Sequence, residues 1–166
     1  MTRPARLLWA TGVLAALSFA ILAWLSITEL TMAGGLGPFD ERVFGYDAEA
    51  ARAYLASLSE PARAVYLGRF RLWDTIFPGL LAFTLCGVIW INTGAYRRLL
   101  ALAPLPYLVM DYRENALVAE LLRSGGSASD RAIADASLAT QAKWGLLALA
   151  AVTVVAIWRL RRGGRA

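Results

Sequence analysis

The chain contains no histidine and a single cysteine, Cys86, which lies inside an apolar segment. These absences argue against a histidine-ligated haem, an iron–sulfur cluster and a structural zinc site, and one cysteine cannot form an intrachain disulfide. The chain also lacks a Walker A loop, a glycine-rich dinucleotide loop and the patterns HExxH and GxSxG. We therefore expect no cofactor and no metal.

Charged residues are also scarce, since they make up 17% of the 166 residues, against about 25% in a typical soluble protein. Hydrophobic residues make up 58%, and they gather in four blocks. A helix needs about 20 mostly apolar residues to cross ~30 Å of hydrocarbon. The pattern excludes a soluble enzyme, a disordered protein and a disulfide-stapled secreted domain. It indicates a polytopic membrane protein.

We predict one transmembrane domain over residues 1–166, with an all-α fold. Its architecture is an integral membrane four-helix bundle with a helical extracytoplasmic cap. The transmembrane spans are predicted at about residues 7–27, 72–91, 99–122 and 139–158. Cleavage of the first span as a signal peptide is the alternative, but its apolar stretch exceeds the ~7–15 residues of a signal-peptide core.

The net charge of +5 follows from an uneven distribution of basic residues. Eight arginines have no acidic neighbour in their segments: Arg3, Arg6, Arg97, Arg98, Arg159, Arg161, Arg162 and Arg165. Four spans would place all eight on one side, which the positive-inside rule makes cytoplasmic. We expect a plasma (inner) membrane protein with cytoplasmic N- and C-termini. The basic charge then reflects topology, and we expect no nucleic-acid partner.

The long connection over residues 28–71 is predicted to form the helical cap. Asp47 precedes a helix-like run, and Ser59 with Pro61 predicts a second helix, because serine caps a helix and proline suits its first turn. The second helix is expected to continue into the membrane. Pro78 inside the next span removes a helical N–H and frees a carbonyl oxygen near residue 74.

Polar residues inside the predicted spans are the candidate ligand-binding site. Asp111, Glu114 and Asn115 share one helix face, because residues three or four apart are neighbours. Counted from the cytoplasmic ends at 1.5 Å per residue, Asp74, Glu114 and Lys143 reach one level in the outer half of the bilayer. Arg71 and Arg113 are further expected partners. We predict that three helices converge on this polar layer.

Several interpretations of the polar layer stay open. It is a structural ion-pair network, or a site for a lipid-like small molecule with Asp111 and Glu114 as acid and base. It is otherwise an ion or proton path, or a carboxylate-bound metal site. Expected partners are membrane lipid, a hydrophobic small molecule, and a second copy or another membrane protein.

Thr140, Lys143 and Trp144 share a face at the start of the fourth span. Thr140 and Lys143 are candidate lining residues of the polar layer. The alternative is a helix entering the interface, with a snorkelling lysine and a tryptophan anchor. For Trp144 we favour the interfacial anchor.

Three short motifs carry a resemblance over about residues 44–158: Asp74-x-x-Phe77-Pro78, Asp111-x-x-Glu114-Asn115 and Ala139-Thr140-x-x-Lys143-Trp144. They resemble a family of uncharacterised four-span bacterial membrane proteins, which implies a four-helix bundle and no known activity. A weaker resemblance is to the emopamil-binding-protein type of sterol isomerase, whose members also have buried acids near a lipid cavity. The absence of histidine departs from those isomerases.

Overall fold

Helices make up 88% of the described residues, and no β-strand occurs among them. The structure is a computed structural model that describes residues 2–31, 35 and 37–163. The all-α prediction is therefore confirmed. In chain order the elements are α1 (Arg3–Leu25), a π-helical turn η1 (Ser26–Leu30), a 3-10 turn η2 (Phe39–Glu41), α2 (Ala48–Ser57), α3 (Glu60–Val65), a π-helical turn η3 (Tyr66–Phe70), α4 (Arg71–Asn92), a 3-10 helix η4 (Ala95–Leu102), α5 (Leu105–Ser124), a 3-10 turn η5 (Gly125–Ser127) and α6 (Asp130–Gly163).

Three continuous helical segments of the described chain are long and apolar enough to cross a membrane. They are Arg3–Leu30, Glu60–Asn92 and Asp130–Arg162, and they contain three of the four predicted spans. The remaining helix, α5, has 20 residues, and its charged side chains lower its hydropathy. A chain with three such helices is compatible with a membrane protein.

The segment predicted as a helix from residue 99 to 122 begins differently. Residues Ala95–Leu102 form the 3-10 helix η4, and the α-helix starts only at Leu105. Pro104 and Pro106 explain the late start, because proline lacks the N–H that an α-helical interior needs but suits a first turn. The predicted start was therefore wrong by about two turns.

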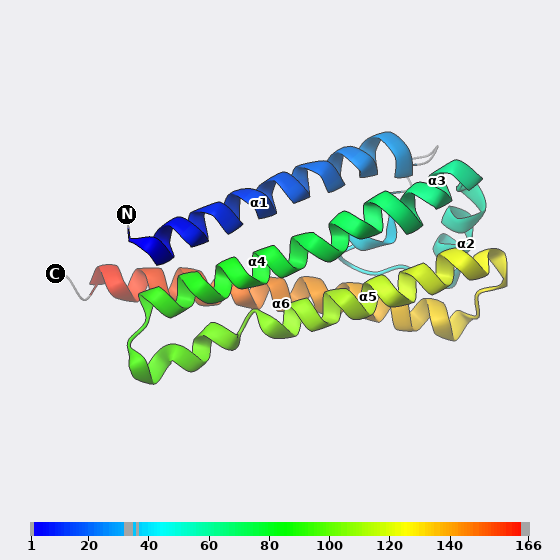
Figure 1. Ribbon diagram of the computed structural model, residues 1–166. Helices are drawn as coiled ribbons and strands as arrows, with labels where there is room; N and C mark the ends of the chain where they lie inside the picture. The colour runs from blue at the N-terminus through cyan, green and yellow to red at the C-terminus, as the bar shows by residue number, and fades with distance from the viewer. Residues whose placement is uncertain (1, 32–34, 36, 164–166) are drawn as a thin grey trace.

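The long helices run side by side (Figure 1). α1 lies along α4, α5 lies along α6, and α4 also contacts both α5 and α6. The start of α1, the end of α6 and the link between α4 and α5 lie at one end of the molecule. The short helices α2 and α3 lie at the other end, beside the turn between α5 and α6.

The connection after α1 forms the predicted helical cap. The Asp47 side chain accepts a 2.8 Å hydrogen bond from the Ala50 N–H at the start of α2. Ser59 caps α3 in the same way through the Ala62 N–H, at 3.3 Å, and Pro61 lies in the first turn. Both caps and the continuation of α3 into α4 are as predicted.

The best-packed core lies between the cap and the adjoining ends of the long helices. Phe39, Tyr54, Tyr66 and Phe70 are all nearly inaccessible, and neighbouring rings lie 5.0–6.5 Å apart in edge-to-face geometry. The Tyr54 hydroxyl also donates to the Leu30 carbonyl at 3.0 Å. The cap is thus docked onto the bundle by aromatic packing.

Away from the cap, the long helices expose large apolar side chains. Examples are Trp9 on α1, Phe83 on α4 and Val152 on α6, which are between 51% and 67% exposed. A soluble monomer rarely shows such a continuous apolar surface. In the hydrocarbon of a bilayer, the exposure of these apolar side chains costs no solvation free energy.

Candidate functional site

The most unusual feature of the interior is a group of buried polar side chains near the cap. We call it the polar cluster, and each member is at most 8% exposed. Its members are Asp40, Asp74, Asp111, Glu114, Asn115, Thr140 and Lys143. Six of the seven are the predicted candidates, and Asp40 is an addition.

Lys143 on α6 lies at the centre of the polar cluster. Its Nζ atom is 3.8 Å from Asp111 Oδ1 and contacts Glu114 Oε2, both on α5. The same atom is 3.8 Å from Asp40 Oδ1 in η2. The predicted convergence of α5 and α6 is therefore a direct contact, and one ammonium group joins the bundle to the cap.

Hydrogen bonds connect the remaining side chains of α5 and α6. Thr140 donates to Glu114 Oε1 and, at 3.2 Å, to the Ala136 carbonyl. Glu114 and Thr140 are completely inaccessible. The spacings 111/114/115 on α5 and 140/143 on α6 give each helix one polar stripe, and the two stripes face each other.

α4 joins the polar cluster through a broken helical hydrogen bond. Pro78 has no N–H, so the carbonyl of Asp74 one turn earlier lacks its helical donor. Asn115 Nδ2 donates to that carbonyl oxygen at 3.1 Å and to Asp111 Oδ2 at 3.4 Å. The predicted free carbonyl is thus used to bind α5.

The charges of the polar cluster do not balance. Four carboxyl groups, of Asp40, Asp74, Asp111 and Glu114, are buried, whereas Lys143 is the one buried cation in the described chain. Asp74 is 6% exposed, and its Oδ2 atom has no hydrogen-bond partner among the described residues. Burying several unpaired carboxylates costs several kcal/mol each, so the excess negative charge requires protons or another cation.

Asp40 is a member of the polar cluster that the sequence did not reveal. The Tyr66 hydroxyl donates to Asp40 Oδ2 and accepts the Phe39 N–H at 3.0 Å. The indole N–H of Trp144 donates to the Asp40 carbonyl oxygen at 2.9 Å. Trp144, favoured above as an interfacial anchor, therefore also binds the cap.

The two π-helical turns explain how Tyr66 reaches Asp40. η3 widens the helix at residues Tyr66–Phe70, and both end residues point into the core. η1 forms the same kind of turn at the end of α1. An ion pair links the two turns, with a guanidinium nitrogen of Arg69 3.8 Å from Glu29 Oε1. Single π-helical turns inside α-helices are frequent at functional sites.

Beside the polar cluster, Arg42 is surrounded by aromatic rings of the cap. Its guanidinium carbon lies 5.0 Å from the Tyr54 ring centre and 5.6 Å from that of Tyr46. Its nitrogens donate to the Gly37 carbonyl at 2.9 and 3.2 Å. Burial raises the pKa of the Tyr46 and Tyr54 hydroxyls well above the ordinary value, so both stay protonated.

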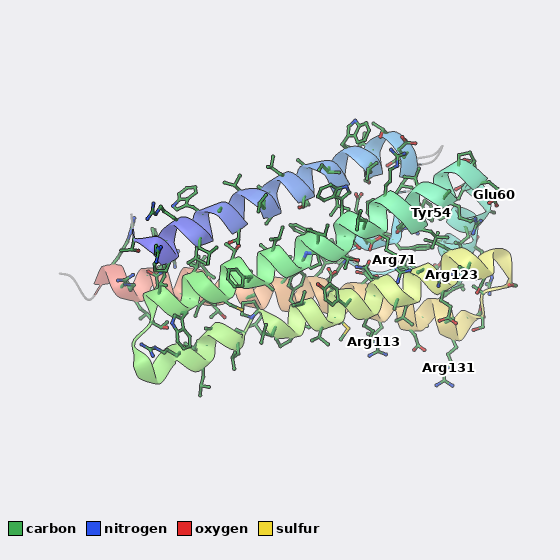
Figure 2. The ribbon with its side chains drawn as sticks, viewed as in Figure 1. Tyr54, Glu60, Arg71, Arg113, Arg123 and Arg131 are labelled. Atoms are coloured by element: carbon green, nitrogen blue, oxygen red, sulfur yellow. The ribbon has the colours of Figure 1, made fainter. Side chains whose placement is uncertain are left out.

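The expected partners Arg71 and Arg113 do not join the polar cluster. Arg113 is exposed and points away from the bundle (Figure 2), and Arg71 is partly exposed. The i, i+2 offset from Asp111 places Arg113 on another face of α5. Lys143 therefore carries the cationic role alone among the described residues.

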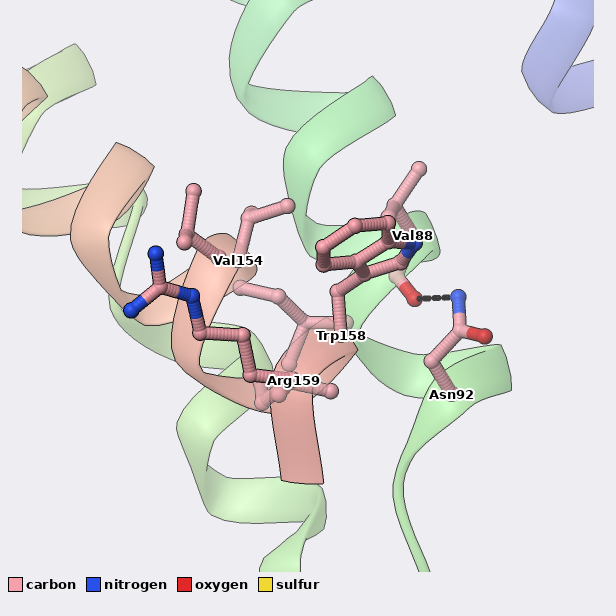
Figure 3. Close-up of a pocket in the computed structure, with 8 residues that line it drawn as sticks. Val88, Asn92, Val154, Trp158 and Arg159 are labelled. Atoms are coloured by element: carbon pink, nitrogen blue, oxygen red, sulfur yellow. Dashed lines mark hydrogen bonds between the residues drawn. The ribbon is translucent and has the colours of Figure 1, made fainter. Parts of the chain in front are cut away.

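Apolar pockets lie farther toward the end opposite the cap. One, of about 510 Å³, is bounded by α4, η4 and the start of α5; a second, of about 440 Å³, lies between α1 and α4. A third, of about 240 Å³, lies between α4 and α6 (Figure 3). No carboxylate lines these three pockets. In the described part of the chain, no group of three histidine, cysteine, aspartate or glutamate side chains is placed to hold a metal ion.

Comparisons with known proteins add no relative: no family model, no curated protein and no solved structure matches this chain. The fold and the site define an all-helical protein with membrane-length helices and a buried polar cluster.

Proposed function

We propose that this chain is a four-span integral protein of a bacterial inner membrane, with both termini cytoplasmic and a structural polar cluster. Its role is non-catalytic, as an accessory subunit beside a second copy or another membrane protein. One observation carries the proposal: Lys143 contacts carboxylates of both α5 and the cap segment η2. That arrangement is suited to holding the cap against the bundle.

The burial of polar groups supports α5 as the fourth span. Asp111, Glu114 and Asn115 face α4 and α6, whereas Val109 on the outer side of α5 is 68% exposed. Charged residues inside membrane proteins face other helices and pair there. The outer surface of α5 is therefore apolar near Val109, whereas the exposed Arg113, Glu120 and Arg123 lie farther toward the cap end.

The distribution of arginines supports the orientation. The start of α1, the η4 link and the end of α6 lie at one end of the molecule and contain seven of the eight arginines without acidic neighbours, and Arg165 lies outside the described residues. The cap end holds the acidic residues. The positive-inside rule assigns the arginine end to the cytoplasm.

A second candidate function is binding or conversion of a lipid-like small molecule at the polar cluster. The unpartnered Asp74 Oδ2 atom and the excess of buried carboxyl groups favour it. Residues that break packing rules are often functional. In this candidate Asp111 and Glu114 exchange protons with the bound molecule, and Asn115, Thr140 and Lys143 position it.

One experiment separates the two candidates. The intact protein is captured in nanodiscs from native membrane, and the molecules that co-purify are identified by mass spectrometry. The comparison is a double variant, Asp111→Asn with Glu114→Gln, that is first shown to be folded by circular dichroism.

The structural proposal predicts the same bulk lipids in both samples and a lower melting temperature for the double variant. A defined lipid or isoprenoid that is enriched in the wild type and lost in the folded double variant would contradict it. That result would establish the binding candidate, and enzyme assays on the molecule would follow.

A further inference from the structure

The cytoplasm-assigned end of the molecule combines an apolar pocket with several arginines. The pocket, of about 240 Å³, lies between Val88–Asn92 of α4 and Val154–Arg159 of α6 (Figure 3). Its floor is apolar, since Ile89 is 1% and Ile157 7% exposed. Its rim carries Trp158 and Arg159, both of which are exposed.

Two further arginines stand at the rim and are held in place. Arg161 donates to the side-chain oxygen of Asn92, which itself lines the pocket. The Arg162 guanidinium lies 3.7 Å from the centre of the Trp158 ring. On the other side of α4, Arg98 lies 4.8 Å from the Trp90 ring centre. The arginines are thus ordered by a neighbouring amide or by indole rings.

These arginines have no acidic partner within the chain at this end. The sequence contains no aspartate or glutamate from residue 75 to 110, none after Asp135 and none before Glu29. These segments therefore supply no carboxylate side chain to neutralise the arginines, and an anionic group of the bilayer can do so. Tryptophan rings beside arginines are typical of the headgroup level of a bilayer.

We infer that the pocket between α4 and α6 is a binding site for one anionic phospholipid. An acyl chain fills the space above Ile89 and Ile157, and the headgroup phosphate accepts hydrogen bonds from Arg159, Arg161 and Arg162. Basic pockets between membrane helices on the cytoplasmic side bind anionic headgroups in this way. The site is separate from the polar cluster and requires only that the chain lies in a bilayer.

The test uses the full chain in nanodiscs of phosphatidylcholine mixed with phosphatidylglycerol, a zwitterionic and an anionic lipid with the same acyl chains. Native mass spectrometry after gentle release counts how much of each lipid stays bound. The expected result for the wild type is one tightly retained phosphatidylglycerol. Equal retention of the two lipids would overturn the inference.

Two variants locate the site. Replacing Arg159, Arg161 and Arg162 with glutamine should weaken phosphatidylglycerol retention about fivefold per arginine, equivalent to ~1 kcal/mol for each basic residue at the surface. The matched control replaces three exposed arginines elsewhere, Arg113, Arg123 and Arg131, and should retain the lipid (Figure 2). An equal loss in both triple variants would overturn the site.

A third variant, Val155→Trp, fills the pocket and keeps every arginine. It therefore tests the site even when the triple arginine variant fails to insert. It should lose the retained phosphatidylglycerol, and unchanged retention would overturn the assignment of the pocket. A chain that never enters the nanodisc would contradict the proposed membrane insertion itself. That failure is recognised separately, because the chain then appears without any lipid.

Discussion

Among the described residues, Lys143 alone is a buried cation, and its ammonium group touches carboxylates from two parts of the fold. Asp74 differs from the other buried acids, because its Oδ2 atom has neither a hydrogen-bond partner nor an ion pair with Lys143 among the described residues. We therefore expect these residues to contribute differently to the stability of the fold. Lys143 and the acids that it touches stabilise the fold, whereas the Asp74 side chain does not.

This difference predicts opposite effects of two similar substitutions. Asp111→Asn removes a charge in contact with Lys143 and should lower the free energy of unfolding by about 1–3 kcal/mol. Asp74→Asn removes an unpartnered buried carboxyl and should leave stability unchanged or raise it. Equilibrium unfolding in mixed micelles, followed by circular dichroism, checks both. A larger loss for Asp74→Asn than for Asp111→Asn would contradict the structural account.

At the level of elements, the cap meets α6 where no side chain fits. Gly45 has φ of +80°, and a Cβ atom there would lie 2.6 Å from Ser137 Oγ and 2.3 Å from Gln141 Nε2. Beside it, the Tyr46 N–H donates to Ser137 Oγ at 2.8 Å. Glycine is therefore required both for the backbone conformation and for close approach.

A pair of glycine substitutions separates those two requirements. Gly35 has a similar φ of +77°, but no atom of the described residues lies within 4 Å of its added Cβ. Gly45→Ala should lower stability by about 1–3 kcal/mol more than Gly35→Ala, because only it forces the cap away from α6. Thermal unfolding of both variants is the measurement. Equal losses would mean that close packing at Gly45 contributes nothing.

The contact between α4 and α5 depends on Pro78, which leaves the Asp74 carbonyl free to accept from Asn115. Asn115→Ala should cost about 1–3 kcal/mol, because the Asp74 carbonyl then loses its donor. In a Pro78→Ala background a helical N–H returns to that carbonyl, so the same asparagine substitution should cost clearly less. A four-way comparison of unfolding free energies checks this. Identical costs in both backgrounds would show that Asn115 acts through another contact.

The sequence predicted those parts of the fold and site that follow from helical periodicity. Asp74, Glu114 and Lys143 could be placed at one depth, because residue number along a helix measures height. Asp40 could not be placed, because it follows Pro38 in a connection where no period fixes its position. The late start of α5 at Leu105 was missed for a local reason, namely the two prolines beside it.

At the scale of the whole molecule, the two ends differ in charge and in packing. The cap end holds the aromatic core and the polar cluster, and the other end holds the apolar pockets and the arginines. A bilayer accounts for both, because the helices between the ends expose apolar side chains. In the proposed four-span topology, the two ends face opposite aqueous compartments.

Single-cysteine labelling tests that topology. Cys86 is first replaced with alanine, and one cysteine is placed either at Thr93 beside η4 or at Ser127 in η5. In intact cells an impermeant maleimide should label Cys at position 127 and not at position 93, and permeabilised cells should label both. Labelling of both in intact cells would contradict a four-span topology.

If Lys143 fastens the cap to the bundle through Asp40, the two side chains are energetically coupled. A double-mutant cycle of Asp40→Asn and Lys143→Met measures this directly as the interaction term in the free energy of unfolding. Lys143→Met alone should cost about 3 kcal/mol, and the two changes together should cost at least 1 kcal/mol less than the sum of their separate costs. Strict additivity, or a Lys143→Met variant as stable as the wild type, would contradict the account.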